Sequence, residues 1–172
     1  LNPDVEFTGN PFPGLLETLA RHGAGLVAPL VTDKAGAVED SVRRFPTLTS
    51  LVLKSRGRDV SRYGLRPGDA DCCPEWVAGM FMLFAEPVFA ALDGFDEGYY
   101  LYYEDVDICW RAWHAGHRIV ACPAVSVIHD ARRASRVSWQ HRRWHLASML
   151  RFLLRSFARR PVVGDAGDLD DA

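Results

Sequence analysis

The chain has 172 residues, of which 48% are hydrophobic and 24% charged, a composition that suits one globular domain with a buried core. Its formal charge of −2 at pH 7 says little about partners, and we expect none of them to be a nucleic acid. The longest apolar run, 76–85, has about ten residues, far short of the roughly 20 that a membrane-spanning helix needs. The four cysteines include no Cys-x-x-Cys pair, so neither a zinc site nor a disulfide framework is indicated, and reduced thiols are expected.

The start of the chain suggests that a segment precedes it. Leu1 is not a methionine, and no charged-then-apolar leader follows it. The first four residues, ending at Asp4, look like the end of a strand that runs into a turn, because proline cannot continue a ladder and Asn and Asp favour turns. We therefore expect the first half of a longer domain to be missing.

The next part of the chain predicts a helix, a buried strand and a long loop. Leucines recur at helical spacing within 13–22, which predicts a helix there, and glycines separate it from an apolar strand over 26–31. The segment 54–73 is rich in Arg, Gly, Asp and Ser without periodicity. It is therefore predicted to be a long loop, which we expect to be flexible.

Short elements follow this loop. The apolar segment 76–84 predicts a strand, 86–92 a short helix, and 94–98 a turn bounded by glycines. An aromatic stretch leads into a helix over 105–115, which begins with acidic residues that suit the helix dipole.

Two strands, 117–121 and 125–128, are expected on either side of Pro123. The segment 139–157 then predicts the clearest amphipathic helix. Its apolar face is predicted to consist of Leu146, Met149, Leu150, Leu153 and Phe157, with Arg151, Arg155 and Arg159 opposite. The acidic segment 161–172 is expected to be a disordered tail.

Three polar positions are predicted to meet at the carboxyl edge of a sheet, where open α/β sheets bind ligands. They are Asp4, the pair Glu104 and Asp105, and His129. Together they would form a site for a metal and a base. Each also has a structural interpretation, because Asp4 suits a turn, the acidic pair suits a helix start and His129 suits a strand end.

The motifs around these positions resemble family 2 glycosyltransferases. Leu-Asn-Pro-Asp at 1–4, Gly-Phe-Asp-Glu at 94–97, Tyr-Glu-Asp-Val-Asp at 103–107 and Ile-His at 128–129 occur in the order and approximate spacing of that family. The segment Ser-Val-Arg-Arg-Phe-Pro-Thr-Leu at 41–48 is similar to the rhamnosyltransferase branch. The resemblance implies an α/β fold of the GT-A type, truncated at its amino terminus, with residues 1–160 as its carboxy-terminal half.

The resemblance also implies a metal site. Asp4 and His129 would bind Mg²⁺ or Mn²⁺ bridging the donor diphosphate, which agrees with the preference of such cations for oxygen ligands and, for Mn²⁺, the tolerance of imidazole. The family's Asp-x-Asp is replaced here by Asn2-Pro-Asp. A site with one carboxylate should hold the metal weakly until the nucleotide adds its own oxygens.

The position that matches the family's general base is Asp105, which would remove the acceptor proton in a single inverting displacement. Glu104 or Asp107 could instead orient the acceptor. Arg111 is either a further contact or a partner of Asp107 at an i, i+4 spacing. Trp76 and Gly79 resemble the floor of the donor and acceptor cleft, although a tryptophan also suits a core.

Gln140, Arg143 and Trp144 form Gln-x-x-Arg-Trp, a motif of processive polysaccharide synthases, and otherwise belong to a basic amphipathic helix. From 131 to 160 the chain has nine arginines and no acidic residue, so this helix could contact an anionic membrane surface. The resemblance implies a nucleotide-sugar donor, with dTDP-rhamnose as the best single choice, and a glycan or polyprenyl-linked acceptor. It also implies a cytoplasmic location, which includes the inner face of the cell membrane. The alternatives are a galactosyltransferase-like enzyme and a silent sugar-binding or scaffolding fragment.

Overall fold

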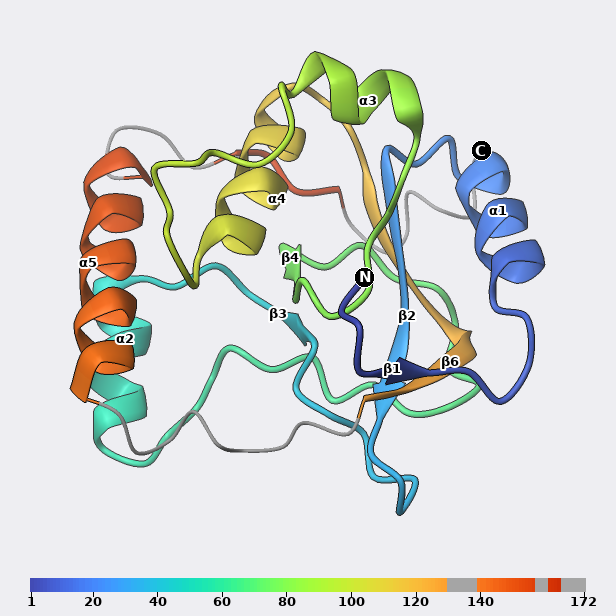
Figure 1. Ribbon diagram of the computed structural model, residues 1–172, viewed down its shortest axis with the longest axis horizontal. Helices are drawn as coiled ribbons and strands as arrows, with labels where there is room; N and C mark the ends of the chain where they lie inside the picture. Colours follow the sequence, from blue (N-terminus) through green and yellow to red (C-terminus); the bar gives the residue numbers. More distant parts are fainter. Residues whose placement is uncertain (130–138, 157–160, 165–172) are drawn as a thin grey trace.

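The structure is a computed structural model that describes residues 1–129, 139–156 and 161–164. It confirms a mixed α/β architecture, built from one four-stranded sheet, a two-stranded ribbon and helices on both sides (Figure 1). The described elements are β1 (Val5–Glu6), α1 (Phe12–Arg21), β2 (Leu26–Thr32), β3 (Val42–Arg43), α2 (Leu48–Ser55), β4 (Trp76–Val77), β5 (Leu83–Phe84), α3 (Glu86–Ala91), α4 (Glu104–His114), β6 (Ile119–His129) and α5 (Trp139–Ser156).

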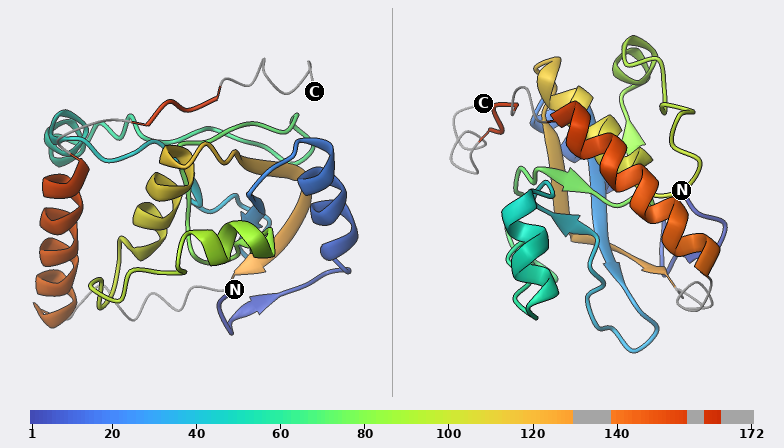
Figure 2. Two further views of the ribbon diagram at one scale, coloured as in Figure 1. Left: turned by 90° about the horizontal axis from the view of Figure 1, so that it is seen from above. Right: turned by 90° about the vertical axis from the view of Figure 1, so that its left-hand side faces the viewer.

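The main sheet has the strand order β1-β6-β2-β5. Its central strands β2 and β6 run parallel, and the short strands β1 and β5 pair antiparallel with them at the two edges. The helix α1 covers one face of the sheet, and α4 lies on the other (Figures 1 and 2). Because both faces are covered, every residue of β2 is buried, as its continuous apolar sequence predicts.

Two strand predictions need correction. The segment 76–84 is not one strand, because β4 pairs with β3 in the ribbon whereas β5 pairs with β2 in the main sheet. Between them, the amide of Gly79 donates to Asp105 instead of to a ladder. The two strands expected around Pro123 form one strand, β6, because a register shift after Pro29 of β2 leaves 123–125 as an extra segment.

The helix α5 is present as predicted, but its buried face is different. Ser148 and Phe152 are buried, whereas Leu146, Leu150 and Leu154 are exposed. The cause is the packing of Phe152 against an aromatic cluster that belongs to α4 and the segments before α2 and α4. Phe157, which was assigned to the apolar face, lies outside the described residues.

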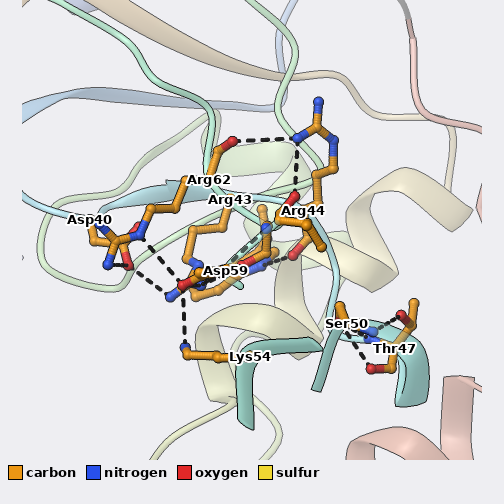
Figure 3. A network of polar contacts seen from close by, with 11 residues as sticks. Asp40, Arg43, Arg44, Thr47, Ser50, Lys54, Asp59 and Arg62 are labelled. Carbon is orange, nitrogen blue, oxygen red and sulfur yellow. Dashed lines mark hydrogen bonds and ion pairs between the residues drawn. The ribbon is translucent and has the colours of Figure 1, made fainter. Parts of the chain in front are cut away.

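The long loop after α2 is confirmed and is anchored by ion pairs. Arg43 of β3 binds Asp59 at 2.8 Å and also contacts Ser61 (Figure 3). The helix α2 was not predicted; it begins with a capping box in which Thr47 and Ser50 bond to each other's backbone amides. At the other end of the chain, Val163 packs against the core, and the predicted acidic tail lies mostly outside the described residues.

Candidate active site

The predicted metal ligands meet where β1 pairs with the end of β6. Val5 lies opposite His129 in this antiparallel pair, so the preceding residue, Asp4, is brought to the same sheet edge. The Oδ1 atom of Asp4 lies 3.3 Å from Nε2 of His129. Asp4 is half exposed, whereas His129 is buried. The Nδ1 atom of His129 is buried and has no hydrogen-bond partner among the described residues.

The separation of this pair is compatible with one shared divalent cation as well as with a direct His–Asp ion pair. Two ligand atoms that bind one Mg²⁺ at about 2.1 Å and at right angles lie about 3 Å apart, close to the observed separation. In the described part of the chain, no group of three or more His, Cys, Asp or Glu side chains is arranged to hold a metal ion. The pair is therefore a partial ligand set, and the remaining ligands would have to be oxygens of a substrate or solvent.

Asp105 lies in the first turn of α4 with both carboxylate oxygens engaged. The amide of Gly79 donates to Oδ2 at 2.9 Å, and the amide of Val106 donates to Oδ1 at 2.8 Å. Burial raises the pKa of Asp105 to about 6; the Gly79 hydrogen bond opposes this shift and the Glu104 charge adds to it. At neutral pH the group is therefore a carboxylate with enhanced proton affinity, which a general base requires.

The neighbouring Glu104 has a carboxylate oxygen without a partner. Its Oε2 atom is buried, and no described residue hydrogen-bonds to it. Buried polar atoms are rarely left unpaired, since the loss of hydration is costly. The Glu104 side chain also lines the two hollows beside Asp105.

The turn before α4 is strained. Tyr102 and Tyr103 both have positive φ, 67° and 69°, a conformation that costs a non-glycine residue about 1 kcal/mol or more. The helix α5 braces this turn, since Tyr102 Oη lies 3.2 Å from His141 Nδ1 and Ser148 Oγ donates to the carbonyl of Leu101 at 2.9 Å. Strain of this kind clusters at functional sites, and here the strained turn leads directly into the first turn of α4, which carries Asp105.

Asp105 and Glu104 lie between two hollows. The first, which we call the asparagine hollow, has a volume of about 580 Å³ and includes Asn2 and Gly79 in its lining. The second, which we call the arginine cavity, has a volume of about 280 Å³. Its lining includes Arg43, Arg44, Lys54, Trp76, Tyr102, Tyr103 and His145. A carboxylate that faces two hollows suits a reaction between two substrates.

Sequence comparison shows which known proteins this chain is similar to. The chain is 36% identical over 129 residues to rhamnosyltransferase WbbL of Escherichia coli (strain K12), an alignment that covers 73% of this chain and 49% of that protein. It is 31% identical over 139 residues to the N-acetylglucosaminyl-diphospho-decaprenol L-rhamnosyltransferase of Mycobacterium tuberculosis, covering 74% and 45%. The chain is a relative of glycosyltransferases.

A more distant relative is the low-salt glycan biosynthesis hexosyltransferase of Haloferax volcanii, 25% identical over 134 residues and covering 76% of this chain and 41% of that protein. No protein-family profile matches the sequence. The chain spans about half the length of the curated relatives it matches. The relatives are named as transferases of sugars, in agreement with the resemblance noted from the motifs.

In this chain, Trp76 and Gly79 line the two hollows beside Asp105. Trp76 lines the arginine cavity and donates its indole N–H to the carbonyl of Arg44 at 2.9 Å. A Cβ atom on Gly79 would lie 3.5 Å from Cβ of Asp105, an ordinary contact. Gly79 therefore contributes its backbone amide to the site, and the site has room for a Cβ atom at this position.

Asp107 and Arg111, in contrast, lie outside both hollows. Asp107 is completely buried, and Nε of Arg111 lies 2.7 Å from its Oδ2 atom, which confirms the i, i+4 pairing. Arg155 of α5 approaches the other oxygen at 3.1 Å. These contacts favour a structural role for both residues, joining α4 to α5.

Gln140, Arg143 and Trp144 lie on α5, outside the two hollows. Gln140 and Arg143 are exposed, and Trp144 packs on the ring of Tyr100 with 4.8 Å between centroids. This geometry adds no support to the interpretation as a processive synthase. None of the helices described is long and apolar enough to cross a membrane.

Proposed function

We propose that this chain carries the general base of an inverting glycosyltransferase. The observation that supports this most directly is Asp105, whose pKa is raised to about 6 and which lies between two hollows. Asn2, in the lining of one hollow, is only two residues from Asp4, so we assign that side to the nucleotide-sugar donor. The arginine cavity is left for the acceptor. The overall fold that we propose is of the GT-A type.

The proposed reaction is a single displacement. The carboxylate of Asp105 takes the proton of an acceptor hydroxyl as that oxygen bonds to the anomeric carbon of the donor. The bond from this carbon to the diphosphate breaks on the opposite face and its electron pair leaves with the nucleoside diphosphate. The anomeric configuration is therefore inverted. Glu104, which lines both hollows, is proposed to orient the acceptor.

We propose that Asp4 and His129 hold Mg²⁺ or Mn²⁺. When bound, such an ion would neutralise charge on the departing diphosphate. The pair contributes one carboxylate and one imidazole, so it should depend on the donor for its remaining ligands.

The names of the relatives support a choice of substrates. The Mycobacterium tuberculosis relative is named for rhamnosyl transfer to N-acetylglucosaminyl-diphospho-decaprenol. We therefore propose dTDP-rhamnose as the donor and a polyprenyl-diphosphate-linked glycan as the acceptor. A galactosyltransferase-like enzyme would instead prefer UDP-sugars, which a comparison of donor affinities separates.

The direct test is the Asp105→Asn variant, with Glu97→Gln as a matched control because Glu97 is an exposed carboxylate outside the two hollows. Loss of the base should lower sugar transfer about a hundredfold or more, while affinity for the donor stays nearly unchanged. The control should transfer sugar at the parent rate. If Asp105→Asn retained transfer within about a fewfold of the parent, the assignment of the base would be wrong.

A further inference from the structure

The segment between α3 and α4 runs alongside α5 before it enters α4 (Figure 1). At its end, the turn 101–103 contacts the α5 residues His141, His145, Ser148 and Phe152. Their spacing of four, three and four residues places them on one face of the helix. None of these contacts comes from the Gln-x-x-Arg-Trp motif, so α5 meets the turn through other residues.

Ser148 is the buried polar residue on this face. It lies in the interior of α5 and is only 6% exposed, and its Oγ donates to the carbonyl of Leu101 at 2.9 Å. Serine favours a helix interior less than alanine does, and a hydroxyl that leaves water without finding a partner lowers stability. In many helices such a serine bonds to a carbonyl of its own helix one turn earlier. Here the bond crosses to the turn, so this contact compensates for the burial of the hydroxyl.

The carbonyl of Leu101 belongs to the peptide group that enters the strained pair, Tyr102 and Tyr103. A peptide group is planar, so a bond to this carbonyl also fixes the orientation of the Tyr102 amide. Rotation about the next bond, from N to Cα of Tyr102, is φ, which has the unfavourable value of 67°. A backbone in this region persists only where surrounding contacts hold it. The Ser148 hydroxyl supplies such a contact at the start of the pair.

The strained pair sets the start of α4. Tyr103 is the N-cap of this helix; its backbone is left-handed, with φ 69° and ψ −3°, and its side chain makes no capping bond. An N-cap usually has an extended backbone and a side chain that bonds to the amides of the first turn. Because α4 lacks such a cap, the position of its first turn depends on how the turn 101–103 is held.

Asp105 lies in that first turn and has little tolerance for a shift. Its Oδ2 atom accepts from the amide of Gly79, in the segment between β4 and β5, at 2.9 Å. A displacement of the first turn by about 1 Å would take these two atoms beyond hydrogen-bonding distance. The same displacement would move the carboxylate away from the place that a reacting hydroxyl has to occupy.

We propose that Ser148 is a positioning residue for Asp105. Its hydroxyl fixes the Leu101 peptide group, the strained pair then keeps its left-handed conformation, and α4 begins where Asp105 meets Gly79. Ser148 is not among the residues that line the two hollows, so it acts through the turn and not by contact with a substrate. The proposed function enters only through the role of Asp105 as the base.

The direct test is Ser148→Ala, which removes the hydroxyl and keeps the Cβ atom. We expect kcat for sugar transfer to fall about tenfold, because the base is displaced, while KM for the donor stays within about twofold of the parent. Ser156→Ala is the matched control, since Ser156 also lies on α5 but its Oγ donates to the carbonyl of Leu153 in its own helix at 3.3 Å. This control should transfer sugar at the parent rate. Circular dichroism and thermal unfolding check that both variants fold.

A double variant separates positioning of the base from a general loss of structure. If Ser148 acts through the Asp105 carboxylate, its hydroxyl has nothing left to position once that carboxylate is removed. Sugar transfer by the Ser148→Ala, Asp105→Asn variant should therefore stay within about twofold of Asp105→Asn alone. A loss by the same factor in both backgrounds would make Ser148 merely structural and would overturn the proposal.

Hydrogen exchange tests the structural link without an assay of sugar transfer. The amide of Asp107 donates to the carbonyl of Tyr103 at 2.9 Å and so closes the first turn of α4. In Ser148→Ala this amide should exchange at least about fivefold faster than in the parent. The amide of Ala115, which donates to the carbonyl of Arg111 at the other end of α4, should exchange at the parent rate.

Two further results would overturn the proposal. One is unchanged exchange of the Asp107 amide in Ser148→Ala, which would show that the hydroxyl does not hold the start of α4. The other is an unchanged kcat in Ser148→Ala when Asp105→Asn is impaired. If Asp105→Asn itself transferred sugar at nearly the parent rate, the proposed function would fail, and hydrogen exchange would still decide whether Ser148 positions Asp105.

Discussion

Asp4 and Asp105, the two aspartates of the proposed mechanism, lie in opposite surroundings. Asp4 is half exposed and precedes a two-residue edge strand, and its Oδ1 atom lies 3.3 Å from Nε2 of His129. Asp105 lies in the first turn of a helix, accepts two backbone hydrogen bonds and follows a strained turn that α5 braces. Its pKa is raised to about 6.

This difference in surroundings matches the two proposed roles, which are metal ligand for Asp4 and general base for Asp105. A metal ligand that shares its ion with a leaving diphosphate can sit at an open edge, because the substrate completes the ligand set. A general base has to be held at a fixed distance from the reacting hydroxyl and needs a raised proton affinity, which burial provides. The packed elements α4 and α5 and the turn between α3 and α4 therefore surround the proposed base, Asp105, and not the proposed metal ligand, Asp4.

The largest effect on donor binding is expected on the metal side. Asp4→Ala and His129→Ala should each weaken donor binding in Mn²⁺ by about tenfold or more, because each removes one of only two proposed protein ligands. In a chelator the variants and the parent should bind the donor equally. Glu6→Gln, at an exposed carboxylate nearby, is the control. Equal losses with and without Mn²⁺ would make the two residues structural.

A smaller effect is expected from the brace on the base side. Arg155→Gln removes a cation that lies 3.1 Å from buried Asp107 and 3.0 Å from Asp96. Because Arg111 still pairs with Asp107 and Arg155 is partly exposed, the free energy of unfolding should fall by only about 1 kcal/mol. Denaturant titration measures this. Arg142→Gln, at an exposed arginine, is the control. If Arg155→Gln had the same free energy of unfolding as this control, the role of the ion pair would be contradicted.

The smallest effect is expected at Gln140. Its side chain is exposed on α5 and lies outside both hollows, so Gln140→Ala should change the free energy of unfolding by less than about 0.5 kcal/mol. Sugar transfer should stay within about twofold of the parent. A large loss of transfer at unchanged stability would restore the interpretation of the Gln-x-x-Arg-Trp motif as functional.

Much of the fold could be predicted from periodicity. The helices α1, α3 and α4 and the buried strand β2 are local patterns, and the structure confirms them within a residue or two. The pairing of β4 and β5 with different partners depends on contacts far along the chain, such as the Gly79 amide with Asp105. The buried face of α5 likewise depends on which aromatic residues Phe152 meets.

The site shows the same division. Motif order indicated Asp4, Asp105 and His129, and the structure brings Asp4 and His129 together. Motif order could not indicate that Asp107 is buried, that Arg155 joins its ion pair with Arg111, or that Arg44 and Lys54 line a cavity beside Asp105. The positive φ of Tyr102 and Tyr103 had no signal either, because tyrosine does not favour that conformation.

The raised pKa of Asp105 also affects stability. Because its pKa in the folded protein, about 6, is above the value of roughly 4 in the unfolded chain, the folded state holds the proton more tightly between these values. The contribution of this group to stability is therefore present below about pH 4 and is lost as the pH rises to about 6. Asp105→Asn should be at least as stable as the parent at neutral pH, which thermal unfolding checks.

The pH dependence of kcat/KM is the sharpest test of Asp105 as the general base, since it reports the pKa of the essential base in the free enzyme. We expect kcat/KM for sugar transfer to fall on the acid side with a midpoint near pH 6, set by protonation of Asp105. The residual activity of Asp105→Asn should lack this acid limb. A parent profile that stays level down to about pH 5, or a limb that persists in Asp105→Asn, would show that Asp105 is not the base.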